Sequence, residues 1–215
     1  MTIGGPIREG TMKAWMRDRY GGVEVLSLRD VPFPDFRDNH EVLVRVHATS
    51  INPADRHNLN LPFIFRRGHG FFKPKSGRFG LDLAGRVELV GKDVKDLHVG
   101  DEVFGVGRGA YGEYAVSDVI EVAPKPAGLT FEEAATVPIA GVTALQGLRD
   151  KAQVRPGQQV LINVASGGVG TFAVQIAKAM GAEVTGVCST RNVEQVKSLG
   201  IDREIDYSRE DFTNL

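Results

Sequence analysis

Residues 160–170 read Val-Leu-Ile-Asn-Val-Ala-Ser-Gly-Gly-Val-Gly, and a helical pattern follows directly. An apolar run therefore meets a glycine-rich turn that opens into a helix. Glycines let the backbone approach a pyrophosphate, and a helix N-terminus presents free N–H donors with a partial positive charge. This strand–loop–helix context predicts a phosphate-binding loop. A plain structural turn is the alternative, because Ala165 stands where the G-x-G-x-x-G pattern has its first glycine.

The chain around this loop reads as alternating strands and helices. Apolar runs predict strands at 160–164, 183–188 and 204–207. Between them lie a helix that begins after the glycines and stops at Gly181, and a polar helix at 192–199. The order β-α-β-α-β is half of a doubly wound parallel nucleotide-binding sheet.

The chain changes character near residue 130. From residue 12 to residue 123 the apolar pattern is short and alternating, with closely spaced turns. Residues 41–49 are typical, since apolar and more polar positions alternate there and predict a half-buried strand. We therefore expect a compact, mostly antiparallel, β-barrel-like domain before the α/β part. Residues 57–79 interrupt it with basic and aromatic side chains, which predict either a lid or docking loop or an insertion that packs its aromatic rings.

Composition narrows the class of protein. The 215 residues carry 42% hydrophobic and 25% charged side chains, which are ordinary globular values. A net charge of −1 gives no electrostatic reason to expect nucleic acid or a membrane as a partner. The single cysteine, Cys188, fits a reducing compartment. The first eleven residues lack the apolar core of a signal peptide, so we expect a cytoplasmic protein.

The end of the second predicted strand indicates which nucleotide the loop would hold. NAD sites usually place an Asp or Glu there for the ribose hydroxyls. Here the strand is followed by Ser189, Thr190 and Arg191. Hydroxyls and a guanidinium bind a 2′-phosphate, whereas a carboxylate repels it. The sequence therefore favours NADP over NAD; the alternative is that Arg191 only caps or solvates its helix.

A metal site is not expected. A catalytic zinc needs three protein ligands with workable geometry. The histidines are scattered at positions 40, 47, 57, 69 and 98, and one cysteine cannot build a four-cysteine lobe. The sequence predicts a redox site without metal.

Ordered blocks of sequence from residue 12 to the end are similar to one known family. The chain resembles the zinc-independent, quinone-oxidoreductase-like branch of the medium-chain dehydrogenase/reductase superfamily. The matching blocks are Met12-Lys-Ala, Tyr20-Gly-Gly-Val-Glu-Val-Leu, Ser50-Ile-Asn-Pro-Ala-Asp55, Gly80-Leu-Asp-Leu-Ala-Gly85, Val99-Gly-Asp-Glu-Val-Phe104, Gly112-Glu-Tyr-Ala115, Ala134-Ala-Thr-Val-Pro138, Thr143-Ala144 and Ala165–Gly170.

This resemblance implies a fold and its domain limits. It implies a flexible N-terminus (1–11), a GroES-like catalytic domain (12–129) and the first half of a Rossmann NADP-binding domain (130–215), with the nicotinamide between the domains. Zinc-dependent relatives carry a cysteine and a Gly-His-Glu where this chain has Ser50-Ile-Asn and Gly80-Leu-Asp. The resemblance also implies further strands after the third Rossmann strand, so we expect a C-terminal part to be missing after residue 215.

The resemblance also implies site residues. Asn52 and Thr143 would border the nicotinamide and its ribose. The pyrophosphate would lie on Ser166, Gly167, Gly168, Val169 and Gly170. Ser189 and Arg191 would hold the 2′-phosphate, and Tyr207 the adenosine side.

The implied reaction is hydride delivery from NADPH to a quinone or to the β-carbon of an α,β-unsaturated carbonyl. Asn52, Asp55 and Tyr20 are the candidates for orienting or polarising the substrate, and each has a structural role as its alternative. The expected partner is a small carbonyl or quinone, with a homodimer as the state of a full-length protein. Two other hypotheses remain: a non-catalytic remnant that at most binds NADPH, and an interaction module built on the basic and aromatic loop.

Overall fold

The structure is a computed structural model that describes residues 10–36, 39–67 and 69–214. Contacts divide the chain into two compact units, Met1–Pro138 and Ile139–Leu215. Most of the predicted flexible segment 1–11 lies outside the described residues. The predicted domain limit at 129/130 stays a prediction. No described helix combines the length and the apolar character needed to cross a membrane.

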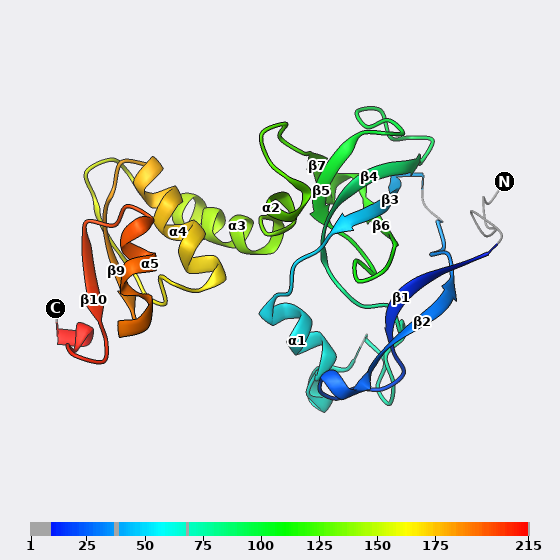
Figure 1. The fold of residues 1–215 in the computed structure, drawn as a ribbon, viewed down its shortest axis with the longest axis horizontal. Helices are drawn as coiled ribbons and strands as arrows, with labels where there is room; N and C mark the ends of the chain where they lie inside the picture. The colour runs from blue at the N-terminus through cyan, green and yellow to red at the C-terminus, as the bar shows by residue number, and fades with distance from the viewer. Residues whose placement is uncertain (1–9, 37–38, 68, 215) are drawn as a thin grey trace. The chain divides into compact units, whose positions relative to one another are not determined.

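The first unit is built on antiparallel strands (Figure 1). A five-stranded sheet has the order β6-β3-β4-β5-β7, and β1 pairs with β2 in a separate ribbon. Isolated β-bridges, such as the one between Ala14 and Gly112, join the β1–β2 ribbon to the rest of the unit. The strands are β1 (Thr11–Arg17), β2 (Leu26–Pro32), β3 (Glu41–Ala48), β4 (Asp82–Val90), β5 (Glu102–Val106), β6 (Tyr114–Asp118) and β7 (Val122–Pro124).

Strand β3 differs from the half-buried strand that alternation predicted. Its first four residues are all buried, and Leu43 is only 3% exposed although it faces away from Val42 and Val44. The strand pairs with β6 and β4 along its two edges, and the burial of Leu43 as well as of Val42 and Val44 shows that both faces of the sheet are covered at this end. Only the second half, from Arg45 on, returns to an alternating pattern.

Short helices connect these strands. Helix α2 begins after Thr130, whose hydroxyl accepts from the backbone N–H of Glu133, and the Glu133 carboxylate accepts from the N–H of Thr130. This reciprocal capping box explains why the helix starts there. The helices of this unit are η1 (Val23–Val25), α1 (Pro53–Leu59), the 3₁₀ helix η2 (Phe63–Phe65), η3 (Val119–Glu121) and α2 (Phe131–Ala135).

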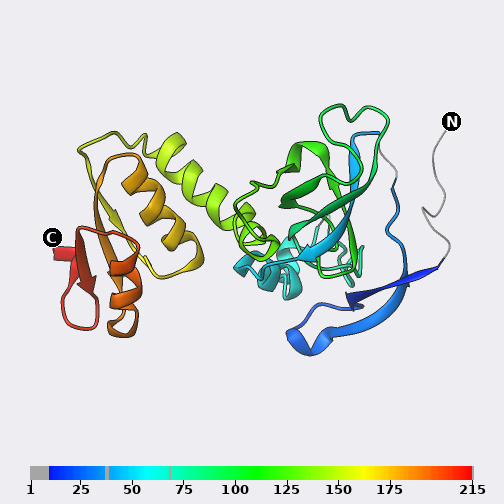
Figure 2. The same ribbon diagram turned by 45° about the horizontal axis from the view of Figure 1, so that its top comes forward.

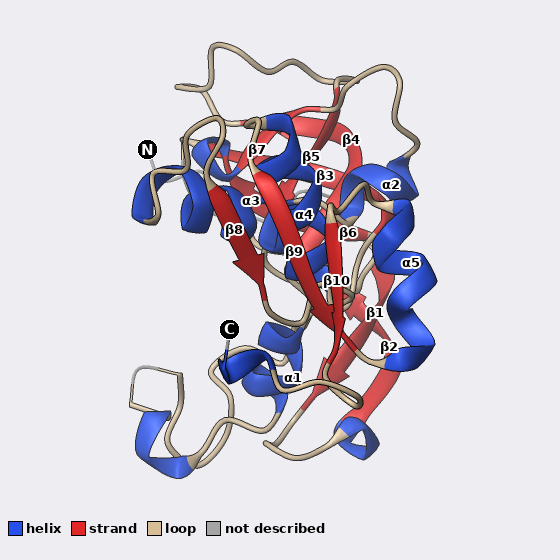
Figure 3. Ribbon diagram, turned by 90° about the vertical axis from the view of Figure 1, so that its left-hand side faces the viewer, coloured by secondary structure: helices blue, strands red, loops and turns tan. Residues whose placement is uncertain are grey.

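The second unit is an α/β fold. Strands β8 (Gln159–Ile162), β9 (Glu183–Cys188) and β10 (Arg203–Asp206) form a parallel sheet in the order β10-β9-β8 (Figure 3). Helix α4 (Gly168–Ala179) packs on β8 and β9, and α5 (Val193–Ser198) packs on β9 and β10 (Figure 2). The predicted β-α-β-α-β order, and with it the combination of an antiparallel β unit and a parallel α/β unit, is confirmed.

Four further helical segments belong to this part of the chain, and its core is apolar. Helix α3 (Pro138–Leu145) continues into a π-helix, η4 (Gln146–Lys151), and the 3₁₀ helices η5 (Thr190–Asn192) and η6 (Phe212–Asn214) follow later. The buried core gathers side chains from η4, the sheet and both helices that cover it, including Leu148, Ile162, Val174, Val184 and Val196.

Candidate functional site

The glycine-rich loop starts earlier than the sequence predicted. Strand β8 ends at Ile162 rather than at residue 164, because Val164 adopts a left-handed conformation with φ of +57°. This conformation is unusual for a β-branched residue and is found at strained turns. The N–H of Gly167 donates to the carbonyl oxygen of Val164 at 2.9 Å and closes the turn. Helix α4 then begins at Gly168.

Two glycines of the loop have different roles. A Cβ atom on Gly170 would lie 2.1 Å from the carbonyl oxygen of Val164, so packing requires a glycine there. A Cβ atom on Gly168 would meet nothing within 4 Å. The helix therefore presents open space beside its first residue, where its N–H groups have no intrahelical partner. Such a cradle fits a pyrophosphate.

The loop is joined to the segment that follows β9. Asn192 donates from Nδ2 to the Oγ of Ser166 at 2.9 Å, and the N–H of Ala165 donates to the carbonyl of Val187 at 2.9 Å. Arg191 is exposed and forms no ion pair with any residue that the structure describes. Arg191 is the residue before Asn192, whose side chain holds Ser166.

Asp206, at the end of β10, is a residue that the sequence analysis missed. It is 8% exposed, and it accepts from the hydroxyl of Thr190 and from the N–H of Ser208 at 3.0 Å. Arg209 lies 3.5 Å away. The hydrogen bond from Thr190 is the main reason why the pKa of Asp206 lies below its ordinary value. The carboxylate in register with Cys188, the last residue of β9, is therefore already engaged by residues of this chain.

The remaining nucleotide-site candidates lie on α3, on α4 and directly after β9 and β10. Val169 is 41% exposed in the first turn of α4, and Tyr207 is 56% exposed directly after β10. Ser189 follows β9, so the candidates after all three strands lie at the same edge of the parallel sheet. Thr143 is exposed on α3, and no hydrogen bond among the described residues joins it to this edge.

In the first unit, Asn52 belongs to a buried polar network. It is 8% exposed, and its amide nitrogen donates to Asp82 Oδ2 at 2.8 Å and to Ser50 Oγ at 3.1 Å. Ser50 Oγ in turn donates to Asp82 Oδ2 at 2.7 Å. Both amide hydrogens of Asn52 are thus engaged inside the chain. Asp82, which is fully buried, was missed because it lies 30 residues from Asn52 in sequence.

Asp55 is buried in the same region. It is 2% exposed, and its Oδ2 accepts from the backbone N–H of Asn52 at 2.9 Å, whereas its Oδ1 has no hydrogen-bond partner. Burial raises the pKa of Asp55, and the nearby charge of Asp82 adds to this. The Tyr111 hydroxyl lies close enough to Asp55 to affect that pKa, but its single proton is directed to the carbonyl of Ser50 at 3.1 Å.

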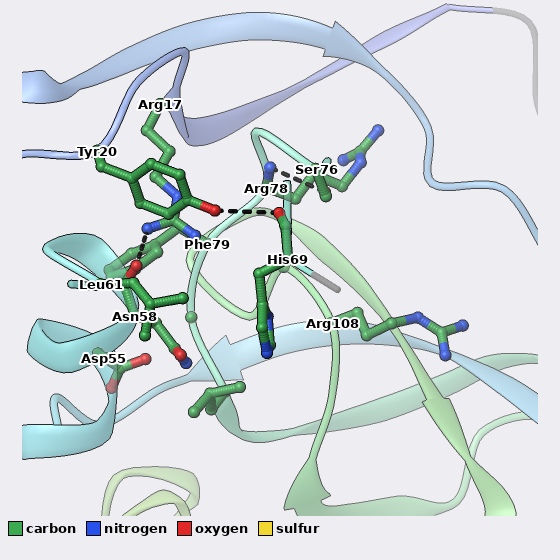
Figure 4. A pocket seen from close by; sticks show the side chains of 13 residues that line it. Arg17, Tyr20, Asp55, Asn58, Leu61, His69, Ser76, Arg78, Phe79 and Arg108 are labelled. Atoms are coloured by element: carbon green, nitrogen blue, oxygen red, sulfur yellow. Dashed lines mark hydrogen bonds between the residues drawn. The ribbon is translucent and has the colours of Figure 1, made fainter. Parts of the chain in front are cut away.

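Tyr20 and Asp55 line the same cavity, which has a volume of about 200 Å³, while Asn52 does not line it. The Tyr20 hydroxyl is committed to the backbone, since it lies 3.1 Å from the carbonyl of His69 and 2.8 Å from that of Gly70. Figure 4 shows the Tyr20 side chain reaching toward His69, with Asp55 on another part of the wall. Tyr20 thus fastens a loop to the β unit.

No group of three or more His, Cys, Asp or Glu side chains in the described part of the chain is arranged to hold a metal ion.

Two protein families match segments of this chain. The family described as Alcohol dehydrogenase GroES-like domain matches residues 38–145, and the family described as Zinc-binding dehydrogenase matches residues 168–214. The chain belongs to the medium-chain dehydrogenase/reductase superfamily. The first matched segment spans β3 to α3, and the second spans α4 to η6.

Relatives within the superfamily are oxidoreductases. The chain is 38% identical to the 2-methylene-furan-3-one reductase of Solanum lycopersicum over 95% of this chain and 54% of that enzyme. The quinone oxidoreductase from Coxiella burnetii superposes with a TM-score of 0.84 at 34% identity, over 95% of this chain and 65% of that one. The Escherichia coli quinone oxidoreductase complexed with NADPH superposes with a TM-score of 0.81 at 29% identity, over 94% and 60%.

The chain spans about half the length of the curated relatives it matches.

Proposed function

We propose that the protein is an NADPH-dependent oxidoreductase that delivers hydride to a quinone or to an α,β-unsaturated carbonyl. The open cradle in front of Gly168, at the N-terminus of α4, is the observation that carries the proposal. The tomato reductase acts on an enone and the Coxiella protein is a quinone oxidoreductase by name, which supports this substrate class.

We assign the cofactor contacts to residues at the edge where the parallel strands end. Ser166 to Gly170 would hold the pyrophosphate, Ser189 and Arg191 the 2′-phosphate, and Tyr207 the adenosine. Arg191 supports NADPH over NADH because its guanidinium has no ion-pair partner among the described residues. Asp206 supports it too, since each of its carboxylate oxygens already accepts a hydrogen bond from this chain, one from Thr190 and one from Ser208.

Asn52 of the antiparallel unit and Thr143 of helix α3 would position the nicotinamide. When bound, NADPH supplies the hydride. Asn52 and Thr143 would border the nicotinamide and its ribose. Asn52 acts by position, because both hydrogens of its amide are already donated to Asp82 and Ser50.

Asp55 is the stronger candidate for holding a proton near the substrate. Its raised pKa favours the protonated carboxyl, and a protonated carboxyl can donate to a developing negative charge. The Tyr20 hydroxyl is the weaker candidate, since its proton is committed to backbone carbonyls.

A turnover assay tests the proposal. The purified chain is mixed with NADPH and phenanthrenequinone, and the loss of NADPH absorbance is followed. Turnover that depends on NADPH supports the proposal. NADPH binding with cooperative unfolding but without turnover would instead support a non-catalytic remnant. A homodimer, a cytoplasmic location and the domain limits 12–129 and 130–215 belong to this proposal as expectations.

A further inference from the structure

The segment after α1 exposes a cluster of apolar side chains. Phe63, Ile64 and Phe65 in η2 are 52%, 76% and 62% exposed, and Phe71 and Phe72 are 47% and 85% exposed. The ring centroids of Phe63 and Phe71 lie 4.2 Å apart, so the two stretches form one surface. This result contradicts the expectation of an insertion that packs its aromatic rings against the domain. An exposed apolar cluster of this kind marks an interaction site.

The same segment is strongly basic. Residues 56–81 contain six Arg and Lys residues and no Asp or Glu. Arg67, Lys73 and Lys75 are exposed, and none of them forms an ion pair with a described residue. Asp18, whose pKa the charge of Lys73 helps to lower, is held by Arg29 at 2.6 Å, and the hydrogen bond from Arg29 is the main cause of the lowered pKa. We call these three cations and the five apolar side chains the aromatic–basic surface.

The aromatic–basic surface is held in place by the rest of the unit. The Tyr20 hydroxyl donates to the backbone carbonyl of His69 (Figure 4). The guanidinium of Arg66 lies 4.1 Å from the centre of the Tyr20 ring. Arg66 also donates to the carbonyl of Leu61 at 2.9 Å, and the N–H of Lys75 donates to the carbonyl of His69 at 2.9 Å. The apolar side chains are therefore presented on an ordered platform.

We propose that the aromatic–basic surface docks onto an anionic lipid membrane. Its apolar side chains would enter the interface between headgroups and acyl chains, while Arg67, Lys73 and Lys75 meet the anionic headgroups. The net charge of −1 describes the whole chain and does not oppose binding to anionic lipid at this surface, because all acidic residues lie outside residues 56–81. The proposal does not rest on the proposed reductase activity.

A second copy of the chain fits this surface less well than a membrane. In a two-fold symmetric dimer the same patch of both copies meets, which would bring the unpaired cations of one copy against those of the other. An anionic lipid surface supplies the opposite charge instead.

Vesicle sedimentation tests the proposal with the full chain. We expect the chain to sediment with phosphatidylcholine vesicles that contain about 30% phosphatidylserine, and much less with pure phosphatidylcholine. Raising the salt to about 0.5 M should weaken binding, because exposed charges are screened. The pair Lys73→Gln and Lys75→Gln should weaken it by about 30-fold. The pair Ile64→Ser and Phe72→Ser should weaken it by about tenfold or more.

Matched control variants lie elsewhere on the β unit. Ile120→Ser removes a side chain that is 87% exposed, and Lys92→Gln with Lys95→Gln removes two exposed cations of another loop. These variants should bind vesicles as the parent chain does, and circular dichroism confirms that all variants are folded. Equal loss in test and control variants overturns the proposal. An absence of vesicle binding overturns it too. If the chain is then dimeric in solution and becomes monomeric with Ile64→Ser and Phe72→Ser, the surface binds a second copy. If it instead binds single-stranded nucleic acid, the surface binds nucleic acid.

Discussion

A Cβ atom on Gly170 would lie 2.1 Å from the carbonyl oxygen of Val164, so the first turn of α4 is packed directly against the strained turn after β8. That contact fixes where the helix N-terminus lies relative to the loop. It also separates two glycines that look equivalent in the sequence, since Gly168 faces open space and Gly170 does not.

The substitutions Gly170→Ala and Gly168→Ala should therefore change different properties, stability in the first and NADPH binding in the second. Gly170→Ala forces the helix away from Val164 and should lower the free energy of unfolding by about 1–3 kcal/mol or more. Gly168→Ala should leave stability unchanged or slightly higher, because alanine favours helix, but should weaken NADPH binding by filling the cradle. Urea unfolding and NADPH titration measure the two effects. Unchanged NADPH affinity in Gly168→Ala would rule out this cradle as the phosphate site.

Val164→Gly should stabilise the protein. A left-handed residue with a side chain costs about 1–2 kcal/mol, while glycine costs about 0.5–1 kcal/mol through the flexibility of the unfolded chain. Little packing is lost, since Val164 is 62% exposed. We expect a gain of about 0.5–1 kcal/mol and a Tm higher by about 2 °C. Val164→Ala is the control and should bring no such gain, and equal melting points for the glycine variant and the parent would contradict the strain.

Arg191→Glu should change the choice of nucleotide. A charge-assisted hydrogen bond to a phosphate contributes about 1.5–3 kcal/mol, so the Kd for NADPH should rise at least about tenfold while that for NADH stays nearly constant. The control is Arg155→Glu, an exposed arginine in the turn before β8, at the other end of that strand. If both nucleotides weaken equally in Arg191→Glu, the residue is not the discriminator.

Asp55→Asn should alter how stability depends on pH. The pKa of Asp55 is raised by burial, so the folded chain binds its proton more tightly than the unfolded chain does. This carboxyl therefore makes the protein less stable as the pH rises from about 4, its ordinary pKa, through the raised value. Asparagine keeps an acceptor for the Asn52 N–H but cannot ionise.

The difference in unfolding free energy between Asp55→Asn and the parent should thus move in favour of the variant between about pH 4 and about pH 8. Urea unfolding at both pH values measures it. Asp96→Asn, which changes an exposed loop carboxylate, serves as the comparison. A difference that stays constant with pH would mean that burial does not raise the pKa of Asp55.

The local sequence pattern was enough to predict the order and type of the helices and strands in the α/β unit. Strand β9 spans the predicted residues 183–188, and α4 ends just before Gly181. The capping box of Thr130 also depends on local pattern alone, because both partners lie within one turn. The end of β8 could not be predicted from the sequence. Valine is a typical strand residue, and only the backbone of the folded loop places Val164 at positive φ.

The sequence by itself determined the order of the elements, the glycine-rich turn before α4 and the cationic end of β9, because these depend on residues that are neighbours in the chain. The tertiary structure alone decided that Asp82 takes both Ser50 and Asn52 as donors across about thirty residues, and that Asp206 is engaged by Thr190. It also decided that Phe63, Ile64 and Phe72 stay exposed. Burial and long-range hydrogen bonds are set by which segments fold against each other, and no local pattern of residue types records that choice.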